Sequence, residues 1–286
     1  MEIGPNFKNI LSYNENMAKG MEDKLFFLNE LPKNQEYTFV DFGCADGTLI
    51  NYLVGIYNNY YTNTYIGYDI SDTMIELAKT NFNGGAKNVH FTSDWKDVVK
   101  NLSEQPIYRK KVLILSSVIH EVYSYAADQD DIITFWRRVV DSGFDYICIR
   151  DMMCSEDLDR PTDPSIIQNI SDIYNDIYNR SNQLIKQKEE FNKHWGSFDN
   201  MKNVVHFLLK YRWVVNWERE LNENYFPITI DDMMENIIEF GTYNLVYFKR
   251  FRVPFLDKCF KDDFNITLDD YTHIKAIFEL NKLNKK

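Results

Sequence analysis

The chain has 286 residues, of which 44% are hydrophobic and 26% are charged, and its formal net charge is −11. This balance is typical of a globular protein with one large core or two modest ones. An acidic chain is poorly suited to holding a nucleic-acid backbone through its overall field, although a local basic patch could still do so. The first residues do not have the pattern of a signal peptide, and no run of about 18 uncharged apolar residues predicts a membrane span.

Cysteine usage points to a reducing compartment. The sequence contains no C-x-x-C pair, so neither a zinc motif nor a redox motif is indicated. The four cysteines are Cys44, Cys148, Cys154 and Cys259. We therefore expect a cytoplasmic protein.

The first half of the chain predicts strands that alternate with helices. Residues 1–36 carry a helical stripe of Met17, Met21, Leu25 and Leu28 that Pro32 closes. The segments that follow are predicted, in chain order, as a strand over 37–42, a helix over 48–57, a strand ending at 69, a helix over 71–82, a strand over 88–94, a strand over 111–122, a helix over 128–143 and a strand over 144–153. This alternation is typical of a doubly wound α/β sheet.

The pattern changes after residue 151. Helices are predicted for residues 199–211 and for a longer segment with Ile166, Ile170, Ile173, Ile177 and Leu184 on one side. Because this block has no strands of its own, we interpret it as an insertion over the edge of the sheet rather than an independent domain. A helix that Gly241 stops and two further strands follow, of which "THIKAIFEL" suits a half-buried strand or a short helix.

The predicted fold is therefore α/β, with a doubly wound, mostly parallel seven-stranded sheet, helices on both faces and a helical insertion after the fifth strand. Four parts are expected. They are an N-terminal helical segment (1–36), a sheet core (37–154), the insertion or lid (155–227) and a C-terminal part that completes the sheet (228–286).

The segment "FVDFGCADGTLI" at residues 39–50 ends a buried strand with an acid and two glycines. In a doubly wound sheet, ligands lie beyond the carboxyl ends of the strands, where the next helix points its free N–H groups. Gly43 and Gly47 allow a sharp turn and a close approach to a ligand, and Asp41 can accept a hydrogen bond or face a cation. The alternative is a simple strand-to-helix turn in which Asp46 caps the helix.

Two further acids end the next two predicted strands. Asp69 lies 22 residues after Gly47, where a carboxylate can accept hydrogen bonds from both hydroxyls of a ribose. Asp94 could accept from an adenine amino group, with Trp95 beside the ring, although an acid after a strand is also common in turns. The implied ligand carries a ribose, an adenine and a positive centre.

Together, "VDFGCADG", "GYDIS", "FTSDW" and "LILSSVIHEV" resemble motifs I to IV of the class I S-adenosylmethionine-dependent methyltransferases in order and approximate spacing. Nicotinamide and flavin domains more usually show G-x-G-x-x-G, whereas the position two after Gly43 is Ala45. Over residues 37–151 the resemblance implies a Rossmann-like core that binds S-adenosyl-L-methionine and releases S-adenosyl-L-homocysteine. The residues it places at the cofactor are Asp41, Gly43, Cys44, Ala45, Gly47, Asp69, Ile70, Ser93, Asp94, Trp95 and Ser116. Cys44 is interpreted as a packing residue, since nothing marks it as a nucleophile.

The resemblance also implies that motif IV, with His120 and Glu121, faces the methyl group of the cofactor. At the end of the fourth strand, a neutral imidazole could take a proton from the acceptor or could only position it, and both roles stay open. Asp151 ends the fifth predicted strand and is a third catalytic candidate. Their spacing matches no metal motif, so a metal held by His120, Glu121 and Asp151 is not predicted.

Two other regions are candidates for binding roles. The family often recruits an upstream cation to the cofactor's carboxylate, which makes Lys19 or Lys24 a candidate, and a solvated helix face is the alternative. The segment "NWERELNENY" at residues 216–225 is predicted to determine acceptor specificity. The insertion also contains aromatic residues that are expected to form core and to wall the acceptor site in part, namely Trp195, Tyr211, Trp213, Trp217, Tyr225 and Phe226.

The predicted function is methyl transfer from S-adenosylmethionine to an oxygen or nitrogen of a small-molecule acceptor. The acidic charge and the aromatic insertion favour a small molecule. RNA or protein methylation is the first alternative, and a catalytically inactive cofactor-binding regulatory subunit is the second. A basic groove for RNA would have to come from Arg137, Arg138, Lys249, Arg250 and Arg252.

Overall fold

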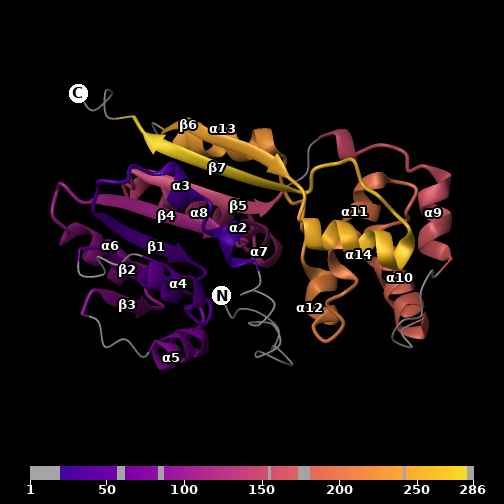
Figure 1. Cartoon of the computed structure of the whole chain (residues 1–286), viewed down its shortest axis with the longest axis horizontal. Helices are drawn as coiled ribbons and strands as arrows, with labels where there is room; N and C mark the ends of the chain where they lie inside the picture. The colour runs from indigo at the N-terminus through magenta and orange to yellow at the C-terminus, as the bar shows by residue number, and fades with distance from the viewer. Residues whose placement is uncertain are drawn as a thin grey trace.

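The computed structural model describes residues 20–56, 62–82, 87–153, 156–172, 181–240 and 243–281. Its centre is a seven-stranded sheet with the strand order β3-β2-β1-β4-β5-β7-β6 (Figure 1). The strands are β1 (Tyr37–Phe42), β2 (Thr64–Tyr68), β3 (Val89–Thr92), β4 (Lys110–Ser116), β5 (Tyr146–Met152), β6 (Tyr243–Phe251) and β7 (His273–Leu280). The predicted α/β class and the seven strands are confirmed.

The sheet is mixed. β1 to β5 pair in parallel, whereas β7 runs antiparallel to both of its neighbours, β5 and β6. The prediction of a strand over this segment is confirmed, with Ile274, Ala276 and Phe278 buried and Glu279 exposed. Because β7 is an interior strand, Ile277 on its other face is buried as well. The strand order reverses between β1 and β4, which is where ligands bind in open α/β sheets.

Apolar clusters cover both faces of the sheet, since alternate residues of a strand point to opposite faces. Tyr37 and Phe39 of β1 pack in a cluster with α2 (Met21–Lys24), α3 (Phe27–Glu30) and α4 (Thr48–Ile56). Val40 and Phe42 belong to the cluster on the other face, which contains α6 (Trp95–Ser103), α8 (Gln129–Asp141) and α13 (Ile230–Phe240). Helices therefore lie on both faces, as predicted.

A third apolar cluster forms a helical lobe beside the sheet (Figure 1). The lobe contains α9 (Pro164–Ser171), α10 (Ser181–Trp195), α11 (Met201–Lys210), α12 (Trp217–Asn222) and α14 (Pro254–Phe264). α14 was not predicted, and its Phe260 and Phe264 are buried with Phe191 and Phe207 of the insertion. The helix after β6 therefore packs with the insertion, while the boundaries of the four predicted parts stay predictions.

Several predicted elements differ from the structure. The long helix of the insertion is divided, since α9 ends at Ser171 and α10 begins at Ser181, and Ile173 and Ile177 lie outside the described residues. α6 lies between β3 and β4, where no helix was predicted. The predicted strand over 111–122 ends at Ser116, and α7 (Ile119–Tyr125) follows. Near the N-terminus, the predicted stripe forms two short helices, α2 and α3, and Met17 is outside the described residues.

The sequence predicted that the chain has no membrane span and that its cysteines are reduced. The structure can be compared with these predictions for the described residues. In that part, no helix has the length and apolar character needed to cross a bilayer. Cys44, Cys148 and Cys259 are free thiols and buried, and Cys154 lies outside the described residues.

Candidate active site

The loop after β1 is held against the end of β2. Gly43 and Gly47 have φ angles of 77° and 78°, and Ala45 between them has a φ of 46°, so three loop residues have left-handed backbone. The N–H groups of Gly43 and Cys44 both donate to the carbonyl oxygen of Tyr68, at 2.7 and 2.9 Å. Burial raises the pKa of the Cys44 thiol well above its usual value, which agrees with a packing role.

Asp69 ties this loop to the residues that follow β2. Its Oδ2 accepts a hydrogen bond from Ala45 N, and its Oδ1 accepts one from Ser71 N, both at 2.9 Å. Burial raises the pKa of Asp69, although the two N–H groups lower it. Each carboxylate oxygen keeps a further lone pair, so Asp69 can still accept from the hydroxyls of a ribose.

Asp41 is a buried residue within β1 and has Lys24 of α2 as a nearby cation. Burial raises the pKa of Asp41 to about 7, although the charge of Lys24 lowers it. Lys24 is only 8% exposed, so the alternative of a solvated helix face was wrong for this residue. Lys19 lies outside the described residues. Lys24 is therefore a buried cation whose charge acts on Asp41, and the cofactor roles predicted for both residues stay predictions.

α7 begins directly beside the glycine loop. A Cβ built on Gly43 would lie 2.8 Å from Cγ2 of Val118, the residue that precedes α7. Asp151 of β5 accepts hydrogen bonds at Oδ2 from the N–H groups of Val118 and Ile119, at 3.0 and 2.8 Å. These bonds cap the start of α7. Val118 and Ile119 were predicted to continue the strand, but the cap from Asp151 makes them the start of a helix.

His120 is buried in the first turn of α7, and its ring is fixed by Asp151. Nδ1 of His120 lies 2.7 Å from Oδ1 of Asp151. Burial lowers the pKa of His120, but the carboxylates of Asp151, Glu223 and Glu121 outweigh burial and raise the pKa to about 9. This upward shift favours the protonated ring, and with it positioning of the acceptor over proton acceptance. The prediction that His120 ends the fourth strand was wrong, because β4 stops at Ser116.

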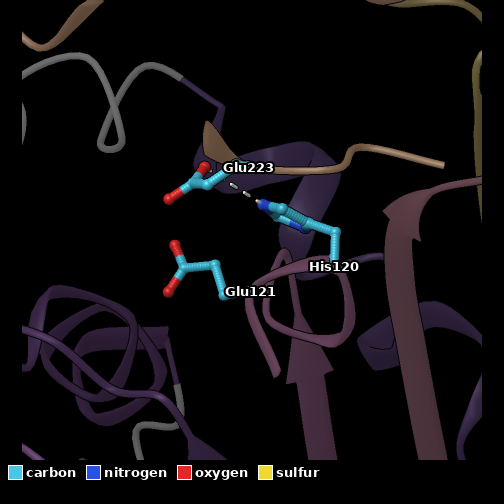
Figure 2. Close-up of side chains that lie close together, drawn as sticks. All are labelled: His120, Glu121 and Glu223. Carbon is cyan, nitrogen blue, oxygen red and sulfur yellow. Dashed lines mark ion pairs between the residues drawn. The ribbon is translucent and has the colours of Figure 1, made fainter. Parts of the chain in front are cut away.

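The side chain of Glu121 lies beside that of Glu223 (Figure 2), and Arg219 of the helical lobe donates to it. Nη2 of Arg219 in α12 lies 2.7 Å from Oε1 of Glu121 and 2.8 Å from Oε1 of Glu223. Oε2 of Glu223 lies 3.9 Å from Nε2 of His120. The structure therefore brings His120 and Glu121 together with Glu223. Asp151 contacts the opposite nitrogen of the His120 ring, Nδ1.

A second layer of buried polar side chains supports Glu223 from the helical lobe. Nζ of Lys210 donates to the carbonyl oxygens of Glu220, at 2.6 Å, and of Glu223. It also lies 4.6 Å from the centre of the Tyr225 ring, and the hydroxyl of Tyr225 donates to Glu220. Burial lowers the pKa of Lys210 to about 7, although Glu220 and Glu223 raise it. Lys210 was not singled out from the sequence, whereas the acids and Arg219 lie in the 216–225 segment that was.

A profile of the methyltransferase domain family matches residues 13–207, which is more than half of the chain. The chain belongs to this methyltransferase family. The resemblance to S-adenosylmethionine-dependent methyltransferases is thereby confirmed, and with it the cofactor class. A search of curated proteins found no significant match.

The chain has distant similarity to several solved structures. The pyocyanin biosynthetic protein PhzM is 10% identical with a TM-score of 0.49, over 98% of this chain and 63% of that chain. A chain of the Pnkp1/Rnl/Hen1 RNA repair complex is 12% identical with a TM-score of 0.47, over 92% and 41%. Magnesium protoporphyrin IX methyltransferase from Synechocystis PCC 6803, with bound SAH, is 10% identical with a TM-score of 0.47, over 97% and 90%. This chain spans less than two thirds of the first two chains.

The remaining cofactor candidates lie at the ends of β2, β3 and β4. Asp94 is exposed and caps α6 by accepting a hydrogen bond from Lys96 N at 2.9 Å. This agrees with the alternative prediction, in which Asp94 has a local role in a turn. Trp95 packs on Phe42 and Tyr68, with ring centroids 5.5 and 5.1 Å apart. The hydroxyl of Ser116 is buried and has no hydrogen-bond partner in the described part of the chain, and its cofactor role stays a prediction.

Three other candidates have simpler roles in the structure. Ile70 is 44% exposed, and the hydroxyl of Ser93 donates to Asp72 at 2.5 Å. Asp46 accepts from the N–H and the hydroxyl of Thr48, at 3.1 and 2.7 Å, so it caps α4 as its alternative role required. The aromatic residues of the insertion mostly form core, as predicted, and they include Tyr211, Tyr225 and Phe226, with Trp195 and Trp217 packed against them.

Proposed function

We propose that this protein transfers the methyl group of S-adenosylmethionine to an oxygen or nitrogen of a small-molecule acceptor. In this reaction the bond between sulfur and the methyl carbon breaks while the bond between acceptor and methyl forms, and the acceptor releases one proton. The positive sulfonium already activates the methyl group, so the protein contributes mainly alignment and the removal of water.

The observation that carries the proposal is that the buried charged residues adjoin the glycine loop. Val118 contacts Gly43, and His120 follows two residues later. Burial raises the pKa of Asp69 most, and the charges of Glu121 and Arg219 change it in opposite directions. These observations support a common location for the acceptor end and the cofactor end of the reaction at the start of α7.

Burial of the charged residues supports a small acceptor. His120, Arg219 and Glu223 are only 4%, 7% and 1% exposed. A group on the surface of a folded macromolecule cannot approach such residues, so their burial favours a small molecule. Burial also strengthens the electrostatic interactions of these residues, because water is excluded.

The basic residues give RNA methylation little support. Arg137 and Arg138 are exposed on α8, and Lys249 and Arg250 are exposed on β6. Arg252 is paired with Asp257 at 3.3 Å. The candidates for a basic groove are thus divided between two elements in an acidic protein.

Turnover with labelled cofactor tests the proposal. The protein is incubated with S-adenosylmethionine carrying a labelled methyl group and with separate panels of phenols, amines, total RNA and folded proteins. We expect label in a small molecule and one S-adenosylhomocysteine for each methyl group transferred. We also expect His120→Ala to reduce turnover at least tenfold, while His194→Ala, on the exposed side of α10, leaves it unchanged. Label only in RNA or protein would contradict the proposal, and tight cofactor binding without turnover would favour a regulatory subunit.

A further inference from the structure

His120, Glu121 and Glu223 have the composition of a metal centre (Figure 2). One ligand atom from each side chain lies within 4.8 Å of the other two. His120 and Glu223 are buried, and Glu121 is partly buried. We propose that these three side chains bind one divalent transition-metal ion, with Mn²⁺ and Zn²⁺ as the best-suited ions.

Each of the three side chains is held at one atom and leaves another for a ligand bond. Nδ1 of His120 is bonded to Asp151, which leaves Nε2. Arg219 holds Oε1 of both Glu121 and Glu223, and the hydroxyl of Tyr125 donates to the same Oε1 of Glu223 at 3.0 Å. Within the described residues, neither Nε2 of His120 nor Oε2 of Glu223 has a hydrogen bond, and the two atoms face each other at 3.9 Å. A histidine that is bound to a carboxylate through one nitrogen and presents the other is the usual form of a histidine metal ligand.

The donor atoms define the kind of ion. One imidazole nitrogen and two carboxylate oxygens suit Mn²⁺, Fe²⁺, Co²⁺ or Zn²⁺, and the absence of a thiolate from this set disfavours Cu⁺. Ligands at about 2.1 Å from one ion lie at most about 4.2 Å apart, so the side chains move together by roughly half an ångström when the ion binds. Three protein ligands leave at least one coordination position for water or for an oxygen of the acceptor.

The local charge also matches a divalent ion. Asp151, Glu121 and Glu223 carry three negative charges when ionised and Arg219 carries one positive charge, which leaves −2 once the ion has displaced the proton of His120 and the ring binds as a neutral ligand. Buried carboxylates are stable only when a cation or proton compensates them. Arg219 contacts the Oε1 atoms of Glu121 and Glu223, whereas the ion would bind their other oxygens, so both cations can be accommodated.

The site would join the two halves of the molecule. His120 and Glu121 belong to α7, whose first turn touches the glycine loop, and Glu223 follows α12 in the helical lobe. A bound ion would fix α12 against α7. This inference goes beyond methyl transfer, which requires the cofactor loop but not the ion.

Metal titration without cofactor or acceptor tests the site. The full-length protein is treated with chelator, dialysed and titrated with Mn²⁺, whose free form is measured by electron paramagnetic resonance, and with Zn²⁺ by calorimetry. We expect one ion per chain and at least tenfold weaker binding by Glu121→Gln and by Glu223→Gln. Asp151→Asn, which disturbs the support of His120 and the cap of α7 but no ligand atom, should weaken binding by about 10–100-fold.

Glu189→Gln on the exposed side of α10 is the matched control and should bind like the wild type. Circular dichroism and thermal unfolding of each variant show whether it is folded, and Glu121→Gln is the most tolerable change because Glu121 is partly exposed. The proposal is overturned if the wild type binds neither ion, or if folded Glu121→Gln and Glu223→Gln bind as tightly as the wild type. Because no methyl transfer is measured, either result leaves the proposed activity to its own test.

Discussion

Gly43 and Val118 approach each other so closely that position 43 has no room for a side chain. A Cβ at residue 43 would lie 2.8 Å from Cγ2 of Val118, and the φ angle of Gly43 is 77°. The contact joins the loop after β1 to the start of α7. The predicted cofactor site and the charged residues of α7 are therefore held together by a position that only glycine can occupy.

Gly43→Ala should lose cofactor affinity and stability for this reason. We expect a loss of about 1–3 kcal/mol in the free energy of unfolding, from left-handed backbone and steric overlap together. Gly55→Ala is the control, because a Cβ at this position in α4 meets nothing within 4 Å. That change should be neutral or stabilising by about 0.4–1 kcal/mol. Denaturant unfolding and cofactor titration of both variants measure the difference, and equal behaviour of the two would contradict the steric explanation.

Asp69→Asn should loosen the connection between the first loop and the end of β2. The carboxylate accepts from Ala45 N and Ser71 N, one at each oxygen, whereas a carboxamide has a single acceptor oxygen. One N–H therefore loses its partner, at a cost of about 1–3 kcal/mol. Unfolding by urea measures the loss, and Asp130→Asn on the exposed start of α8 serves as the comparison. A loss no larger than that of Asp130→Asn would show that the two bonds contribute little.

The buried carboxyl group of Asp41 should make stability depend on pH. Burial raises the pKa of Asp41 from 3.8 to about 7, so the folded protein keeps a proton that the unfolded chain has released between these values. The folded state binds more protons in this window, and its free energy of unfolding therefore falls as the pH rises from about 4 to about 7. Asp41→Asn removes this contribution, so the free energy of unfolding of the variant should increase relative to that of the wild type as the pH rises. Urea unfolding at pH 5, 6, 7 and 8 measures the difference, and a constant difference or the opposite slope would disprove the assignment.

Phe264→Ala should destabilise the helical lobe although it lies in the C-terminal part of the chain. Phe264 is fully buried in the cluster that also contains Phe191 and Phe207. Removal of a buried phenylalanine ring costs about 3–5 kcal/mol. Phe255→Ala, at the start of the same helix, removes a ring that is 65% exposed and should change stability by less than about 0.5 kcal/mol. If both changes cost the same, α14 is not a part of the core of the lobe.

The sequence was sufficient for features that depend on neighbours in the chain or on adjacent strands. Gly43, Gly47 and Asp69 were predicted to gather beyond the carboxyl ends of β1 and β2, and hydrogen bonds from Ala45 and to Tyr68 hold this region together. Parallel strands bring their carboxyl ends to one edge, so chain order alone places such residues near one another. The cofactor roles of the individual residues stay predictions.

Contacts between distant segments had no local signal. α7 starts where Asp151 of β5 caps it. The sequence does not show that Asp151 is near, so Val118 and Ile119 were predicted as part of a strand. Glu223 reaches His120 only because α12 packs beside α7, and the 216–225 segment indicated polar density but no partner. For Asp94 the sequence could not distinguish two roles, because an aspartate can accept a hydrogen bond from an adenine or cap a helix.

Calorimetric titration with S-adenosylmethionine and S-adenosylhomocysteine tests the cofactor site most directly. The wild type is compared with a Gly43→Arg, Asp69→Ala double variant and with Gly55→Ala. We predict saturable binding of one molecule per chain to the wild type and to Gly55→Ala, and no binding to the folded double variant. Failure of the wild type to bind either compound, or undiminished binding by the double variant, would contradict the placement of the cofactor at the loop after β1.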